Sequence, residues 1–82
     1  IGLTKYLATY WATHGVRVNA ISPSGVFNNH PAAFVQKLSN LIPMRRMADI
    51  DEYKAAILFL VSDASSYMTG SNLIIDGGKT CW

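Results

Sequence analysis

The segment from Arg17 to Asn28 holds the residues whose types and spacing best suit the binding of a ligand. An apolar run leads directly into the turn Ser22-Pro23-Ser24-Gly25, and Val26 and Phe27 follow the turn. In open α/β sheets, ligands bind in the crevice at the carboxyl ends of parallel strands. A strand that stops abruptly at a Pro/Gly turn is therefore predicted to form one wall of a binding site.

Other residue types with chemical potential are scattered along the chain. His14, His30 and Cys81 lack the spacing of metal ligands, so we expect no metal site. The adjacent pair Arg45-Arg46 favours a solvated or interface role over contact with an anionic ligand. Asp76 stands before two glycines at the end of an apolar run, where a structural turn is favoured over catalysis.

Length and composition restrict the class of protein. Of 82 residues, 50% are hydrophobic and 15% are charged, a balance that argues against intrinsic disorder. A formal net charge of +2, without an aromatic stacking platform, is too small to indicate a nucleic-acid partner. No apolar run reaches the roughly 18 residues of a membrane span, and no secretory leader is visible. One cysteine fits a reducing compartment, and we expect a cytoplasmic protein.

Apolar periodicity predicts the elements that must position these residues. They are expected in the order helix Ile1–His14, strand Val16–Ser22, short helix Pro31–Leu38, helix Ile50–Ser62 and strand Asn72–Asp76. The two strands are mostly apolar with little alternation, which is typical of parallel strands covered on both faces. A strand, a helix and a second strand in this order imply one parallel crossover connection.

Local signals sharpen parts of this prediction. Asp49 and Glu52 match a capping box at the start of the second long helix. That helix is apolar around much of its circumference, so we expect it to be buried on more than one side. Asn19 lies in an apolar strand and is expected to satisfy neighbouring backbone groups.

Seven short motifs occur along the chain in a fixed order. They are Gly2-Leu-Thr-Lys5, Gly15-Val-Arg-Val-Asn19, Pro43–Met47, Leu58-Phe-Leu60, Ser62-Asp63, Thr69-Gly70 and Asp76-Gly-Gly78. In this order and spacing the chain resembles the last third of a short-chain dehydrogenase/reductase. The resemblance implies an α/β fold: a C-terminal fragment, helix-strand-loop-helix-strand, of a Rossmann-type doubly wound parallel sheet. Residues 1–82 would form the C-terminal portion of one NAD(P)-binding domain, with a substrate loop at about 24–48.

The resemblance also assigns cofactor-binding roles to the turn after the first strand. Pro23 matches the family residue that packs on the nicotinamide ring, and the backbone of Val26 matches the group that hydrogen-bonds the nicotinamide carboxamide. Asn28 stands where many members have a Thr that assists this contact. Ser24 replaces the usual Gly and requires an ordinary backbone conformation. Gly25 is expected to absorb some of the local strain.

The implied substrate is a small-molecule secondary alcohol or its ketone, with a sugar-related compound as a further hint. Phe27, His30 and Phe34 lie in the presumed substrate loop and are candidate contacts. The implied cofactor is NAD or NADP, and this sequence does not select between them. The resemblance further implies a homo-oligomer, either a dimer or a tetramer.

Two motifs of the family are absent from this sequence. One is the Gly-rich TGxxxGxG turn, and the other is the Tyr-x-x-x-Lys pair, in which Tyr acts as general acid/base. The resemblance places that pair about one helical turn before Ile1, so we expect a fragment and assign no catalytic residue within it. Two alternatives stay open: a non-catalytic oligomerisation or interaction module, and a pseudoenzyme fragment.

Overall fold

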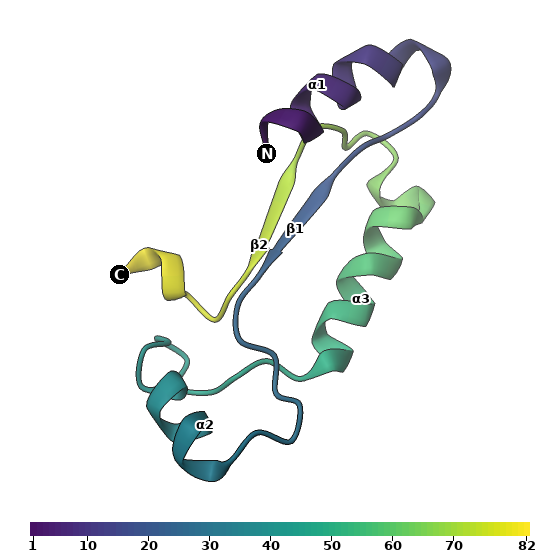
Figure 1. Ribbon diagram of the computed structural model, residues 1–82. Coiled ribbons are helices and arrows are strands. Elements are labelled where there is room, and N and C mark those ends of the chain that lie inside the picture. Colours follow the sequence, from purple (N-terminus) through teal and green to yellow (C-terminus); the bar gives the residue numbers. More distant parts are fainter.

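The computed structural model describes all residues from 1 to 82 and has the predicted α/β order (Figure 1). Its elements are α1 (Gly2–Trp11), β1 (Ala20–Pro23), α2 (Ala32–Ser39), α3 (Ile50–Val61) and β2 (Asn72–Ile75). Three short 3₁₀ turns follow α1, α3 and β2, at Ala12–His14, Asp63–Ser65 and Lys79–Cys81. No helix combines the length and the apolar character that crossing a membrane requires.

The two strands form a parallel sheet, as predicted from the order of the elements. The register runs from Ala20 opposite Asn72 to Pro23 opposite Ile75. In Figure 1 both strands run from the α1 end of the molecule toward α2, and α3 lies along one side of them. The turn after β1 and the turn after β2 therefore lie at the same edge of the sheet.

The first strand begins later than predicted. Val16–Asn19 is extended but lies outside β1, because its backbone pairs with a turn instead of a strand. The Val18 carbonyl accepts a hydrogen bond from Gly70 N–H at 2.7 Å, and Val18 N–H donates to Thr69 Oγ1 at 3.1 Å. The Asn19 side chain satisfies neighbouring backbone groups, as predicted. Its Nδ2 donates to the Met68 carbonyl at 3.0 Å, and its Oδ1 accepts from Ser71 N–H at 3.0 Å.

Helix α3 has the predicted start but not the predicted burial. Its capping box is present, with Asp49 N–H donating to Glu52 Oε1 at 2.9 Å. Tyr53 is the only buried residue of the helix, whereas Leu58 and Val61 are largely exposed. The expectation of burial on more than one side is wrong for this chain, because a two-stranded sheet offers the helix a single face to pack on.

The molecule is elongated and exposes much apolar surface. Its radius of gyration is 15.4 Å, against about 12 Å for a compact domain of this length. Its exposed surface is 5938 Å², against about 4,900 Å² for a compact monomer of its mass. The buried residues are Ala8, Ile42, Met47, Tyr53 and Ser65. Three of these five lie between residues 42 and 53, so the best-packed region supports the carboxyl edge of the sheet.

Candidate functional site

The turn that follows β1 is held by a segment that precedes α3. Val26 forms an isolated parallel bridge with Ala48. Phe27 N–H donates to the Ala48 carbonyl at 2.9 Å, and Ala48 N–H donates to the Gly25 carbonyl at 2.9 Å. Successive peptide groups of an extended chain point in opposite directions. The N–H and C=O of Val26 therefore face away from Ala48, and Val26 N–H donates to no group of this chain.

Ser24 fits the turn without backbone strain. Its φ is not positive, so the backbone has the ordinary conformation that a residue with a Cβ requires here. Its backbone N–H donates to the Tyr53 hydroxyl at 3.2 Å, and that hydroxyl donates to the Ile75 carbonyl at 2.6 Å. The Ser24 Oγ is buried and has no hydrogen-bond partner. Tyr53 thus joins the ends of both strands through one oxygen.

Gly25 has a different role from the predicted one. Its φ is not positive, so it does not relieve a left-handed conformation. A Cβ at this position would lie 2.7 Å from Leu38 Cδ2 and 3.4 Å from Met47 Cε. Gly25 therefore leaves room for the end of the Leu38 side chain of α2, which would have to shift to admit a Cβ.

The turn that follows β2 is structural, as predicted. Hydrogen bonds from Thr80 and from the backbone N–H of Gly78 lower the pKa of Asp76. Gly77 has φ +64°, and Met44 N–H donates to its carbonyl at 3.1 Å. A Cβ on Gly77 would lie 2.7 Å from Ile42 Cγ2. This turn is therefore the platform on which the end of the presumed substrate loop rests.

Three aromatic rings from that loop gather beside the turn. The His30 ring lies between Phe27 and Phe34, with centroids 6.5 Å and 5.1 Å away respectively. Asn28 is exposed, and its backbone N–H faces His30 Nδ1 at 3.4 Å. An open groove of about 550 Å³ runs from here along α2. Its lining is Phe27, His30, Ala32, Val35, Gln36, Ser39, Asn40 and Arg45. The structure therefore brings the three candidate substrate-loop residues together.

The two adjacent arginines both have partners within the chain. Arg46 forms a bidentate pair with Glu52, with nitrogen–oxygen distances of 2.7 and 3.0 Å. Hydrogen bonds from Arg46 and from Asp49 N–H lower the pKa of Glu52 to about 2, and the Glu52 carboxylate raises the pKa of Arg46. Arg45 donates to the Asn40 carbonyl at 3.0 Å and lies over the Trp82 ring, 5.3 Å from its centroid. Both side chains stabilise the loop around the site.

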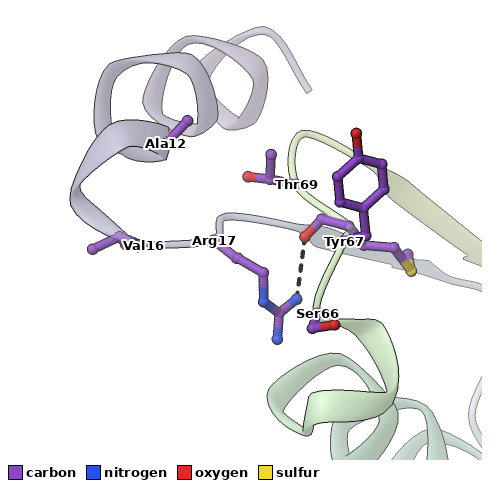
Figure 2. Close-up of a pocket in the computed structure, with 8 residues that line it drawn as sticks. Ala12, Val16, Arg17, Ser66, Tyr67 and Thr69 are labelled. Atoms are coloured by element: carbon purple, nitrogen blue, oxygen red, sulfur yellow. Dashed lines mark hydrogen bonds between the residues drawn. The ribbon is translucent and has the colours of Figure 1, made fainter.

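A residue without a predicted role, Arg17, holds the opposite end of the molecule together. It donates to the carbonyls of Met68 at 3.1 Å, Leu60 at 2.9 Å and Ser62 at 3.3 Å. It lines a groove of about 490 Å³. Figure 2 shows it between the end of α1 and the loop that carries Tyr67. The last carbonyls of a helix lack internal partners and favour a cation. A single arginine just before an apolar strand could therefore have been predicted to bind the last carbonyls of a helix. We call these three contacts of Arg17 the Arg17 clamp.

Comparisons with known proteins give one consistent result. A family model described as enoyl-(acyl carrier protein) reductase matches residues 1–80. The chain is 43% identical to D-arabinitol 2-dehydrogenase (ribulose-forming) of Candida tropicalis, covering 100% of this chain and 32% of that protein. It is 40% identical to galactitol 2-dehydrogenase of Rhizobium johnstonii, covering 98% and 34%. The chain thus spans about a third of the length of the curated relatives it matches.

Solved structures agree with these sequence relatives. A short-chain dehydrogenase of Leptospira borgpetersenii with bound NAD⁺ is 46% identical, with a TM-score of 0.88 over 96% of this chain and 31% of that one. A putative 2-deoxy-D-gluconate 3-dehydrogenase of Agrobacterium tumefaciens with bound NADP is 36% identical. Its TM-score is 0.87 over 99% of this chain and 35% of that one.

Proposed function

Because this chain belongs to the short-chain dehydrogenase/reductase family, we propose that it forms the nicotinamide-side wall of an NAD(P)-dependent oxidoreductase. The observation that carries the proposal is the Val26 backbone. Its N–H lies at the carboxyl edge of the parallel sheet, faces away from its bridge partner and has no acceptor within the chain. Val26 is half-buried, and its N–H is therefore available as a donor to a ligand at this edge of the sheet.

The residues of the turn suit the nicotinamide end of such a cofactor. When bound, a nicotinamide cofactor would accept a hydride from the substrate carbon in alcohol oxidation and would return it in the reverse reaction. Pro23 is exposed at the end of β1 and offers an apolar surface for the ring. Val26 N–H donates to the carboxamide oxygen, and the exposed Asn28 side chain has both a donor and an acceptor for the same group. These residues bind and orient the cofactor, and none of them moves a proton.

The substrate that we propose is a sugar alcohol, oxidised at a secondary hydroxyl to a ketose. Support comes from two relatives whose names are those of polyol 2-dehydrogenases. The groove along α2 supports it too, because the amide and hydroxyl groups of Gln36, Ser39 and Asn40 line it together with the rings of Phe27 and His30. In the proposal the His30 ring and its two Phe neighbours cover the substrate on the loop side. NAD and NADP both remain candidates, since relatives hold each of them.

Two other functions make different predictions. The description of the matching family model favours reduction of an enoyl thioester as the second candidate. The exposed apolar faces of α1 and α3 favour the alternative of a non-catalytic interaction module. Oxidation of pentitols or hexitols by the intact protein supports the first proposal, and reduction of an enoyl thioester with NADH or NADPH supports the second. Binding of neither cofactor would leave only the interaction module.

Substitution of Val26 by Pro tests the turn itself in the intact protein. The change removes the N–H, and the matched control Val26→Ala keeps it. Loss of one hydrogen bond predicts a rise in the Michaelis constant of the preferred cofactor of about fivefold for Val26→Pro. Val26→Ala should stay within about twofold of the wild type. Equal Michaelis constants in all three proteins, for NAD(H) and for NADP(H), would contradict the proposed contact.

A further inference from the structure

The Tyr53 hydroxyl occupies the place of a hydrogen bond of the sheet. Ala20 N–H donates to the Ser71 carbonyl at 2.9 Å, and in a parallel ladder the same bond recurs every second residue. Continued along the two strands, this series places Ser24 N–H opposite the Ile75 carbonyl. Instead, Tyr53 accepts from Ser24 N–H and donates to the Ile75 carbonyl. One oxygen thus stands between two groups that would otherwise meet.

An oxygen inserted between the two groups holds them further apart than a direct hydrogen bond would. A direct bond of the ladder spans 2.9 Å, whereas the bridge consists of two bonds in series, of 3.2 and 2.6 Å. The Tyr53 side chain is held in place by its surroundings, because it is 7% exposed and is the buried residue of α3. Ser24 and Val26 both lie at this edge of the sheet.

Ser24 has one polar group that the fold does not use. Its N–H is taken by Tyr53, but its Oγ is buried without a partner. Burial of an unpaired hydroxyl is costly and uncommon. Val26, two residues further on, has an N–H that is equally unused. An acceptor oxygen and a donor N–H on one short turn complement a primary carboxamide, which offers N–H groups and a carbonyl.

We propose that Tyr53 is a positioning residue that holds this edge open, and that Ser24 Oγ accepts a hydrogen bond from the carboxamide N–H of the bound nicotinamide. The inference rests on the proposed function and adds a second contact to that of Val26. Tyr53 acts through Ser24 and does not touch the cofactor. Removal of the phenol oxygen lets the strands close and moves Ser24 away from the ligand.

Ser24→Ala in the intact protein tests the direct contact, with the exposed Ser66→Ala as the matched control. The dissociation constant of NADH or NADPH should rise about fivefold for Ser24→Ala. The melting temperature of the cofactor-free protein should stay unchanged or rise, because an unpaired buried hydroxyl is removed. The affinity for ADP-ribose, which lacks the nicotinamide, should not change. A lower melting temperature with an unchanged dissociation constant would show that Ser24 is bonded within the protein and would overturn the proposal.

Tyr53→Phe tests the positioning role, with Tyr67→Phe as the control, since the Tyr67 side chain is fully exposed. The dissociation constant of the reduced cofactor should again rise about fivefold, and the ADP-ribose affinity should not change. Combined with Ser24→Ala, the two effects should not multiply, because both variants lose the same contact. Effects that multiply would refute action through Ser24. If the wild-type protein binds neither cofactor, the proposed function fails as well, whereas normal binding by Ser24→Ala refutes this inference alone.

Discussion

Substitution of Gly77 by Ala should destabilise the protein more than its backbone conformation alone requires. Gly77 has φ +64°, and a Cβ there would lie 2.7 Å from Cγ2 of Ile42. Ile42 is 2% exposed and cannot move into solvent without uncovering the best-packed part of the chain. Two costs therefore apply: about 1 kcal/mol for the left-handed conformation, and about 1–3 kcal/mol for overpacking.

Gly15→Ala separates the two costs. Gly15 has φ +73°, close to that of Gly77, but a Cβ there would meet no atom within 4 Å. We expect a loss of about 1 kcal/mol in the free energy of unfolding for Gly15→Ala. For Gly77→Ala we expect about 2–4 kcal/mol. The difference between the variants measures the contact with Ile42.

Urea denaturation of the intact protein is the assay, and steady-state kinetics provide a second measurement. Because Ile42 lies at the end of the presumed substrate loop, Gly77→Ala should also raise the Michaelis constant of the alcohol substrate. In combination with Ile42→Ala, the loss from Gly77→Ala should shrink, since the clashing methyl group is gone. Equal losses for Gly15→Ala and Gly77→Ala would refute the reasoning that space at Gly77 is limiting.

Three further predictions concern stability. Arg17→Met should lower the free energy of unfolding by about 2–4 kcal/mol, because three carbonyls lose a charged donor. In the same urea titration, Arg17→Lys should recover part of this free energy. An unchanged free energy of unfolding in both variants would contradict the stabilising role of Arg17. The folded-state pKa of Glu52, about 2, lies below its ordinary value of 4.5, so its stabilising effect is present above pH 4.5 and is lost as the pH falls toward 2. Glu52→Gln should therefore remove part of the acid dependence between these pH values, and parallel acid-unfolding curves would count against the pair. The isolated 82-residue chain, with five buried residues, should unfold in a broad transition, and a sharp monomeric two-state melt in calorimetry would disprove this.

Features determined by neighbouring residues were predictable from the sequence. The Asp49–Glu52 capping box depends on a spacing of three residues, and the end of β1 depends on the Pro-Ser-Gly turn. The parallel pairing followed from the order of the elements, which restricts a strand-helix-strand unit to one arrangement. The placement of Val26 at the carboxyl edge of the sheet followed from the same two facts, and its contact with the cofactor stays a prediction.

Features determined by distant residues were missed. Tyr53 looked like one more apolar position of its helix, because its hydroxyl partners lie 29 and 22 residues away. Gly25 looked like a site of conformational strain, whereas the reason for it is the approach of Leu38. The late start of β1 depends on the turn at Thr69, whose side chain takes a backbone N–H that a strand would use. None of these contacts leaves a periodic signal in the sequence.

The separation of the two paired strands has a consequence for synthesis of the protein. Ala20 and its partner Asn72 are 52 residues apart. At a translation rate of about 5–20 residues per second, β2 is synthesised about 3–10 s after β1. During this interval an apolar strand is open to pairing with other nascent chains. Pro23 lacks an N–H, and at the end of β1 it shortens the edge that such a wrong partner could extend.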